Sequence, residues 1–246
     1  MSESNTVTWI IGASSGVGAS SALALAASGR VLALSGRRVD ALEVVRAKVE
    51  QRGGRAIVIP MDAADDESTR QALDRVHAEA GAVDEIVFCA GMNVTKRHWD
   101  KLEIAEFQAV VETNLTSVAR GISAVLPEMR SRGRGRVVVI SSWAGWAFGR
   151  GAGVAYSASK TGLISLTESL NDQESAHGIS ATVICPGDID TEFVDKRPTV
   201  PDAAARSRML SPDDVARAVA FVVDSPADVC VNELVISPVH SHSYGK

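Results

Sequence analysis

Short apolar runs rich in β-branched residues alternate along the chain with longer stretches whose apolar positions recur at helical spacing. The short runs predict strands at 7–11, 31–35, 56–61, 85–89, 136–140, 181–184 and 234–236. The longer stretches predict helices at 17–28, 39–51, from about 67, at 102–130, at 155–177 and from the cap sequence at 211–214. Gly29 and Gly178 follow two of these stretches and are expected to end the helices.

The order of these elements predicts the fold class. Strands separated by helices imply right-handed crossovers, which give a mostly parallel sheet covered by helices on both faces. The run at 136–140 is apolar almost throughout, as expected for a strand buried on both faces. We therefore predict an α/β protein with a three-layer, doubly wound Rossmann fold and a mostly parallel seven-stranded sheet. We expect residues 1–246 to form a single domain.

One irregular stretch, 188–209, is rich in Pro, Asp and Arg. A loop of this length in a compact domain usually has a function. We interpret it as a substrate-covering loop, with an ordinary surface excursion as the alternative.

Composition and charge exclude several classes of protein. The net charge of −5 and the absence of a Lys/Arg cluster disfavour nucleic-acid binding. No apolar run reaches the roughly 18 residues that span a bilayer, and the polar N-terminus lacks a signal sequence. Cys89, Cys185 and Cys230 lack metal-ligand spacing, and we interpret them as buried thiols in a reducing compartment. We expect a cytoplasmic protein without a metal, a nucleic-acid partner or a membrane partner.

A glycine-rich loop connects the first strand to the first helix. Gly12, Gly16 and Gly18 allow a tight turn and a close approach to a pyrophosphate, which the following helix N-terminus would attract. This position favours dinucleotide binding over a plain turn. The residues expected to contact the dinucleotide here are Gly12, Ser14, Ser15, Gly16, Val17 and Gly18.

The second strand indicates which dinucleotide is bound. Its end carries Ser35, Arg37 and Arg38 and lacks the acid that would accept a hydrogen bond from the ribose 2′-hydroxyl of NAD. Arginine can instead bind a 2′-phosphate, so we predict NADP(H). The alternative is a solvated start of the next helix. Asp62 is placed to face the adenine, with Ala63 beside it, or could equally cap a helix.

Tyr156 and Lys160 lie four residues apart and share one face of a predicted helix. A nearby ammonium favours the phenolate and would lower the pKa of the tyrosine, so Tyr156 is a candidate general acid/base. Ser142 follows a buried strand at its carboxyl end, where doubly wound sheets bind ligands, and could polarise a substrate oxygen. Each feature alone is weak, because each also has a plain structural explanation; their joint occurrence is specific.

These motifs, together with Thr113-Asn114-Leu115 and Pro186-Gly187 followed by Thr191, resemble the classical short-chain dehydrogenases/reductases over nearly the whole chain. The resemblance implies a catalytic tetrad of Asn114, Ser142, Tyr156 and Lys160, in which Asn114 holds a water in a relay to Lys160. It implies further cofactor contacts that come from Ala90, Gly91, Tyr156, Lys160, Pro186, Gly187, Ile189 and Thr191. Two departures are Ile11 in place of the usual Thr, and Phe88-Cys89 in place of the usual Asn-Asn.

Large side chains surround the expected carbonyl position. Ser142, Trp143, Trp146 and Phe193 are candidate substrate contacts and suggest an apolar or planar small-molecule alcohol or carbonyl compound. The helices at 102–130 and 155–177 are apolar on more than one side. In the resembled family these helices form a dimer interface, which implies a homodimer or homotetramer.

We therefore predict an NADP(H)-dependent oxidoreductase that interconverts an alcohol and a ketone or aldehyde, with Tyr156 as general acid/base. An NADP(H)-binding sensor or scaffold without turnover is the alternative, and its support is the altered Phe88-Cys89 segment. Dehydration or epimerisation is disfavoured by the glycine spacing.

Overall fold

The computed structural model describes residues 6–27 and 29–239, and their strands form a single parallel sheet. The strands are β1 (Val7–Ile11), β2 (Val31–Gly36), β3 (Arg55–Pro60), β4 (Glu85–Phe88), β5 (Gly135–Ile140), β6 (Ile179–Pro186) and β7 (Glu233–Ile236). Their order is β3-β2-β1-β4-β5-β6-β7. The chain winds outward from β1 to β3 and then crosses to β4, so the direction of winding reverses between β1 and β4. Ligands bind at such a reversal in doubly wound sheets.

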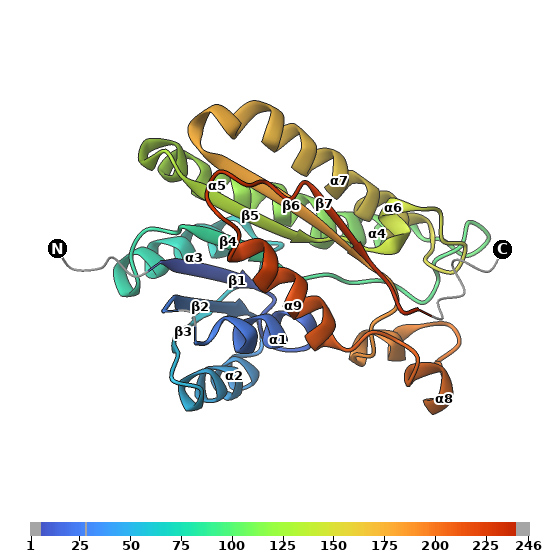
Figure 1. The fold of residues 1–246 in the computed structure, drawn as a ribbon. Helices are drawn as coiled ribbons and strands as arrows, with labels where there is room; N and C mark the ends of the chain where they lie inside the picture. The colour runs from blue at the N-terminus through green and yellow to red at the C-terminus, as the bar shows by residue number, and fades with distance from the viewer. Residues whose placement is uncertain (1–5, 28, 240–246) are drawn as a thin grey trace.

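Helices cover both faces of the sheet (Figure 1). One face packs against α1 (Gly16–Leu25), α2 (Val39–Gln51) and α9 (Pro212–Val223). The other packs against α3 (Asp66–Glu79), α5 (Ser117–Arg132) and α7 (Val154–Glu174), with α4 (Ile104–Val111) against α7. Alternate residues of β1 enter the two cores, with Trp9 on the α3 side and Ile10 on the α1 side. The predicted three-layer fold is therefore confirmed, with a sheet that is entirely parallel.

Two segments depart from the sequence-based expectations. The helix expected at 102–130 is interrupted by a π-helical turn, Glu112–Thr116, between α4 and α5. Residues 188–209 contain a 3₁₀ turn, Glu192–Lys196, and the short helix α8 (Ala203–Arg206). This stretch folds back on itself, because Ile189 and Leu210 form a parallel bridge. The start of α9 is as predicted, with a capping box that Ser211 and Asp214 form around Pro212.

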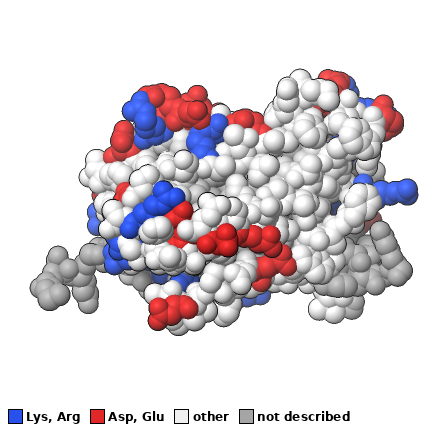
Figure 2. Space-filling view, turned by 90° about the horizontal axis from the view of Figure 1, so that it is seen from above, with Lys and Arg blue, Asp and Glu red and all other residues white. Residues whose placement is uncertain are grey.

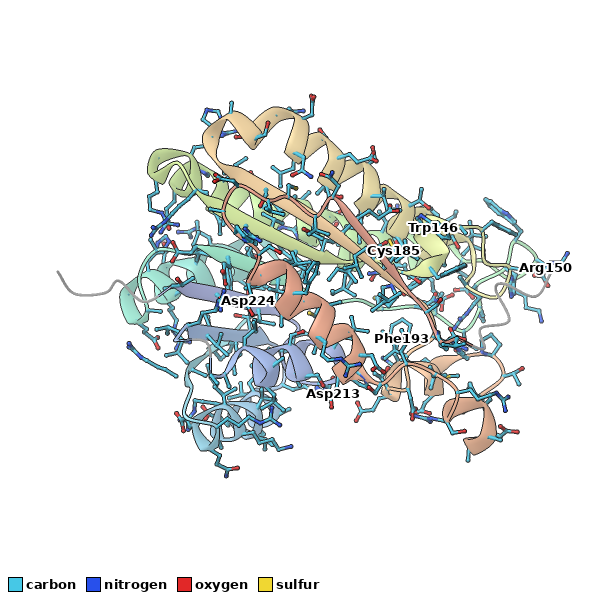
Figure 3. The ribbon with its side chains drawn as sticks, in the orientation of Figure 1. Trp146, Arg150, Cys185, Phe193, Asp213 and Asp224 are labelled. Carbon is cyan, nitrogen blue, oxygen red and sulfur yellow. The ribbon has the colours of Figure 1, made fainter. Side chains whose placement is uncertain are left out.

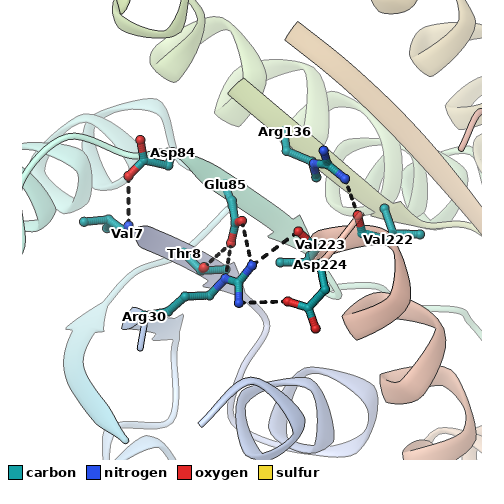
Figure 4. Close-up of polar contacts among 9 residues, drawn as sticks. All are labelled: Val7, Thr8, Arg30, Asp84, Glu85, Arg136, Val222, Val223 and Asp224. Atoms are coloured by element: carbon teal, nitrogen blue, oxygen red, sulfur yellow. Dashed lines mark hydrogen bonds and ion pairs between the residues drawn. The ribbon is translucent and has the colours of Figure 1, made fainter. Parts of the chain in front are cut away.

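A network of charged side chains ties the amino ends of the strands to α9 (Figure 4). Arg30 forms ion pairs with Glu85 and Asp224 and donates a hydrogen bond to the carbonyl of Val223. Glu85 also accepts a hydrogen bond from the Thr8 hydroxyl. The network lies at the edge of the sheet opposite to the carboxyl ends, so it anchors the fold away from the expected ligand site.

The molecular surface shows no concentrated basic patch on the face in Figure 2, where Lys and Arg side chains are scattered among Asp and Glu. None of the helices in the described part of the chain has the length and apolar character needed to cross a bilayer. The expectation of three buried thiols is wrong for Cys230, which is exposed; Cys185 is buried and Cys89 is partly buried.

Candidate active site

A cleft of about 1190 Å³ opens at the carboxyl ends of the strands. It runs from the loop between β1 and α1, past the ends of β2 and β4, to the segments that follow β5 and β6. The sheet order explains this arrangement. The chain leaves β1 toward α1 on one face of the sheet and leaves the neighbouring strand β4 toward the other face, so a crevice opens between the two connections.

The glycines of the first loop permit close packing around this cleft. A Cβ on Gly12 would lie 2.5 Å from the Ala90 nitrogen, and φ at Gly12 is +88°. A Cβ on Gly18 would lie 2.2 Å from the Gly12 carbonyl oxygen. Gly18 therefore supports the loop from behind and does not line the cleft, whereas Gly12 and Gly16 do line it.

The N-terminus of α1 fits an anionic group. Its cap residue, Ser15, makes no side-chain capping hydrogen bond, and the first turn carries no acid. The first amides of the helix are therefore left for another acceptor, and Ser14, Ser15, Gly16 and Val17 line the cleft at this point. Uncapped amides and the helix dipole together suit the pyrophosphate of a dinucleotide.

Of the three residues at the end of β2 that were expected to contact the 2′-phosphate, two line the cleft and one is buried in the core. Arg37 and Arg38 are exposed and line the cleft. Arg38 reaches over the glycine loop and donates hydrogen bonds to the hydroxyls of Ser14 (3.3 Å) and Ser15 (2.7 Å). Ser35 is fully buried, and its hydroxyl accepts a hydrogen bond from the indole of Trp9 at 2.8 Å. Ser35 is thus held in the core, outside the cleft, because side chains alternate between the two faces of a strand.

Asp62 lines the cleft and does not cap a helix. Its Oδ1 accepts a hydrogen bond from the Ala64 amide at 3.1 Å, which makes a local turn. The N-cap of α3 is Asp65, whose carboxylate accepts from the Ser68 amide. The helix-cap explanation is therefore wrong, and the contact of Asp62 with the adenine stays a prediction. Ala63, Ala90 and Gly91 line the same cleft.

Tyr156 and Ser142 come together from α7 and from the end of β5. The Ser142 hydroxyl lies near enough to the Tyr156 phenol to lower its pKa, and it accepts a hydrogen bond from the Ala144 amide at 3.2 Å as the cap of α6 (Trp143–Trp146). The Tyr156 ring packs beside Phe193, with 5.9 Å between ring centroids. Burial of the phenol raises the pKa of Tyr156, while Ser142 and the charges of Arg197 and Arg97 act to lower it. In the protein alone, burial therefore moves the pKa of Tyr156 in the direction opposite to the fall expected beside Lys160.

Lys160 lies one helical turn further along α7 and is 4% exposed. Its ammonium donates to the Ile140 carbonyl at 2.8 Å and lies 5.8 Å from the centre of the Tyr156 ring. Ser141, to which the sequence assigned no role, donates to the Lys160 carbonyl at 2.7 Å and links α7 to the end of β5. Burial lowers the pKa of Lys160 to about 8. An ammonium has three N–H donors, so this one keeps capacity to bind further hydroxyl groups.

Asn114 is positioned by the π-helical turn and is fully buried. Its amide accepts from the Met92 nitrogen (2.7 Å) and donates to the Met92 carbonyl (2.9 Å) and the Ser159 hydroxyl (3.1 Å). A Cβ built on Gly91 would lie 3.5 Å from Asn114 Oδ1 and 3.6 Å from Lys160 Nζ, so both groups border the same small space. A π-turn at a functional site is common.

The remaining candidates divide into two groups. Pro186, Gly187, Ile189 and Thr191 line the cleft, and so do Trp143 and Phe193. Figure 3 shows Phe193 beside the carboxyl ends of the strands. Trp146 is 46% exposed and does not line the cleft. Its ring instead packs edge-on against that of Trp143, with 5.0 Å between the ring centroids.

Arg97 is a cleft residue that had no sequence signal. Arg97 follows β4 outside any motif, yet it is buried and lines the cleft with Tyr156. Only the fold brings it there, because its neighbours come from the segments around Gly151 and Lys196.

The sheet order, the glycine loop and the Tyr156–Lys160 pair define a nucleotide-binding oxidoreductase fold, and the comparisons agree. The family model for short chain dehydrogenases matches residues 6–201. The chain belongs to the short-chain dehydrogenase/reductase family, as the sequence motifs predicted.

Individual relatives cover the chain to different extents. It is 33% identical to cis-4-hydroxycyclohexanecarboxylate dehydrogenase of Sinomonas cyclohexanicum, over 92% of each chain. It is 32% identical to glycine betaine reductase of Emericella nidulans over 96% of its own length, but it spans 19% of that protein. Among solved structures, an alcohol dehydrogenase from Thermococcus sibiricus complexed with 5-hydroxy-NADP superposes with a TM-score of 0.85. The two chains are 30% identical, with 96% of this chain and 97% of that chain covered.

Proposed function

We propose that this protein is an NADP(H)-dependent oxidoreductase that interconverts an alcohol and a ketone or aldehyde. The observation that carries the proposal is the convergence of the Tyr156 phenol, the Ser142 hydroxyl and the buried Lys160 ammonium at one end of the cleft. The uncapped amides of α1 lie at another part of the same cleft and suit a dinucleotide.

The preference for NADP(H) rests on charge at the end of β2. Arg37 and Arg38 border the cleft, and the strand carries no carboxylate that would repel a phosphate. Paired arginine hydrogen bonds are well suited to a phosphate group. The solved Thermococcus sibiricus relative carries an NADP derivative, which supports the same cofactor class.

The residues of the chain divide the work in the following way. The bound nucleotide supplies or accepts the hydride. Tyr156 gives a proton to the carbonyl oxygen in reduction and takes one from the hydroxyl in oxidation, and Ser142 orients that oxygen. Lys160 binds ribose hydroxyls and stabilises negative charge on the phenol. Asn114 fixes the Gly91–Met92 backbone beside Lys160 and supports the water relay.

Two further expectations belong to this proposal. Residues 188–209 cover the substrate, since Phe193, Val194 and Arg197 of this stretch line the cleft. The protein acts as a homodimer or homotetramer, which the apolar helices α4, α5 and α7 suggest; sedimentation velocity would measure the assembly.

The experiment is an assay at 340 nm with NADPH and with NADH against aldehydes, ketones and keto acids. Because the chain is similar to the Sinomonas dehydrogenase, the first alcohol to test is cis-4-hydroxycyclohexanecarboxylate, with NADP⁺ as the oxidant. Tyr156→Phe should lower kcat by about 10²- to 10⁴-fold and leave nucleotide affinity unchanged, because general acid/base catalysis supplies about that factor.

Two outcomes would contradict parts of the proposal. Nucleotide binding without any turnover would favour a sensor over an enzyme. A preference for NADH would overturn the role given to Arg37 and Arg38.

A further inference from the structure

Arg97 is a buried cation at the substrate end of the cleft. It is 5% exposed and lines the cleft together with Tyr156 and Phe193. Its guanidinium donates to three main-chain carbonyls: Nε to Val94 (2.8 Å), Nη2 to Lys196 (3.0 Å) and Nη1 to Gly151 (3.5 Å).

The backbone of Arg97 is fixed to the start of the catalytic helix. Its carbonyl accepts a hydrogen bond from the Val154 amide at 2.9 Å. Gly153, the N-cap of α7, has φ +89°, and a Cβ there would lie 2.4 Å from the Arg97 Cβ. Since Tyr156 lies in the first turn of α7, the distance between Arg97 and the phenol is set by rigid elements. The two groups interact electrostatically.

The charge of Arg97 has no anionic partner among the described residues. The three acceptors of its hydrogen bonds are neutral carbonyls, and burial together with the nearby Arg197 lowers the pKa of Arg97. Arg197 differs, because it is paired with Asp188. A buried charge is costly unless it is paired with a charge of opposite sign. Arginine stays protonated in proteins, so the cost is not removed by loss of a proton.

The guanidinium of Arg97 also has N–H donors that its three carbonyl acceptors do not use. It has five N–H groups, of which three are used by the carbonyls above, and this leaves one on each terminal nitrogen. Two N–H groups of one guanidinium can bind a carboxylate through a pair of hydrogen bonds.

We propose that Arg97 is a specificity-determining residue that binds a carboxylate on the substrate, so that the protein acts on hydroxy acids and oxo acids. The inference rests on the proposed oxidoreductase function and adds the class of substrate to it. The competing explanation is that Arg97 only ties the segments at Val94, Gly151 and Lys196 together.

The test compares matched acids and neutral compounds. The turnover probes are 4-oxocyclohexanecarboxylate and its primary amide, which have similar shapes but differ in charge. The binding probes are cyclohexanecarboxylate and cyclohexanecarboxamide, titrated by calorimetry into the NADP⁺ complex. The variants are Arg97→Gln and Arg97→Lys. The control is Arg150→Gln, because Arg150 is exposed and lies at the outer end of the loop before α7 (Figure 3).

We expect Arg97→Gln to lower kcat/KM for the acid by on the order of 10- to 100-fold, mainly through a higher KM. The same variant should change kcat/KM for the amide by less than about threefold. Arg97→Lys should recover part of the preference for the acid, and Arg150→Gln should keep all of it. Binding of cyclohexanecarboxylate should weaken by a similar factor in Arg97→Gln.

The inference is overturned if the wild-type protein does not prefer acid over amide in either assay. It is also overturned if Arg97→Gln lowers kcat/KM for the acid and for the amide by the same factor, since a purely structural role of Arg97 would give that result. Failure of the proposed function is a separate outcome: no carbonyl compound is reduced, while the calorimetry still reports on Arg97.

Discussion

Replacing Lys160 with methionine should change how the stability of the nucleotide-free protein depends on pH. Burial lowers the pKa of Lys160 from 10.5 to about 8. A fall of this size corresponds to about 3 kcal/mol of destabilisation while the side chain is charged in both the native and the unfolded state. Methionine has a similar length and carries no charge, so the variant escapes this cost.

The sign of the effect follows from proton binding. Below about pH 8 both states of the wild type hold the proton, and the full cost is present. Between about pH 8 and 10.5 the unfolded state binds more protons than the native state, so wild-type stability rises with pH. From about pH 7 to 9.5 the wild type should gain about 2 kcal/mol relative to Lys160→Met. A constant offset of about 1 kcal/mol is expected, because the variant leaves the Ile140 carbonyl without its donor.

The assay is urea unfolding of both proteins at several pH values within this window. Lys48→Met provides the control, since Lys48 is exposed on α2 and its loss removes one amine without removing a buried charge. A difference between Lys160→Met and wild type that stays constant across this range would refute the reasoning, because the ammonium would then be as well solvated as in the unfolded chain.

Two further predictions concern other parts of the fold. Glu85→Ala should lower the free energy of unfolding by about 3 kcal/mol, because it leaves the largely buried Arg30 without its main partner; urea unfolding measures this, and nucleotide affinity should be unchanged because the network lies at the opposite edge of the sheet. Iodoacetamide should modify native protein at Cys230 faster than at Cys89 and Cys185, since Cys230 is exposed and burial raises the pKa of the other two thiols to about 12 and about 11. Peptide mapping by mass spectrometry would show the labelled site, and rapid labelling of Cys89 would contradict the burial argument.

Most of the fold could be predicted because its signals are local. The apolar run at 136–140 and the alternating helices required a parallel sheet, and the capping box at Ser211 fixed the start of α9. The π-helical turn at Glu112–Thr116 could not be predicted, because apolar spacing does not distinguish a π-turn within an otherwise regular helix.

The site was predictable where its residues belong to motifs. Tyr156, Lys160, Ser142 and the glycine loop lie on one cleft, as the spacing and the positions after strands suggested. Ser35 was harder, because the choice between cleft and core depends on which face of β2 its side chain takes and on the partner it finds there, Trp9.

The amino-acid sequence by itself determined the layers of this protein, the order of its elements and the family motifs, since these depend on periodicity and on residues close together in the chain. Tertiary structure alone decided which side chains meet across long separations. Arg97 reaches the cleft only because segments 54 and 99 residues further along the chain supply carbonyls for its guanidinium. Its buried charge arises from packing, which leaves no periodic trace in the sequence.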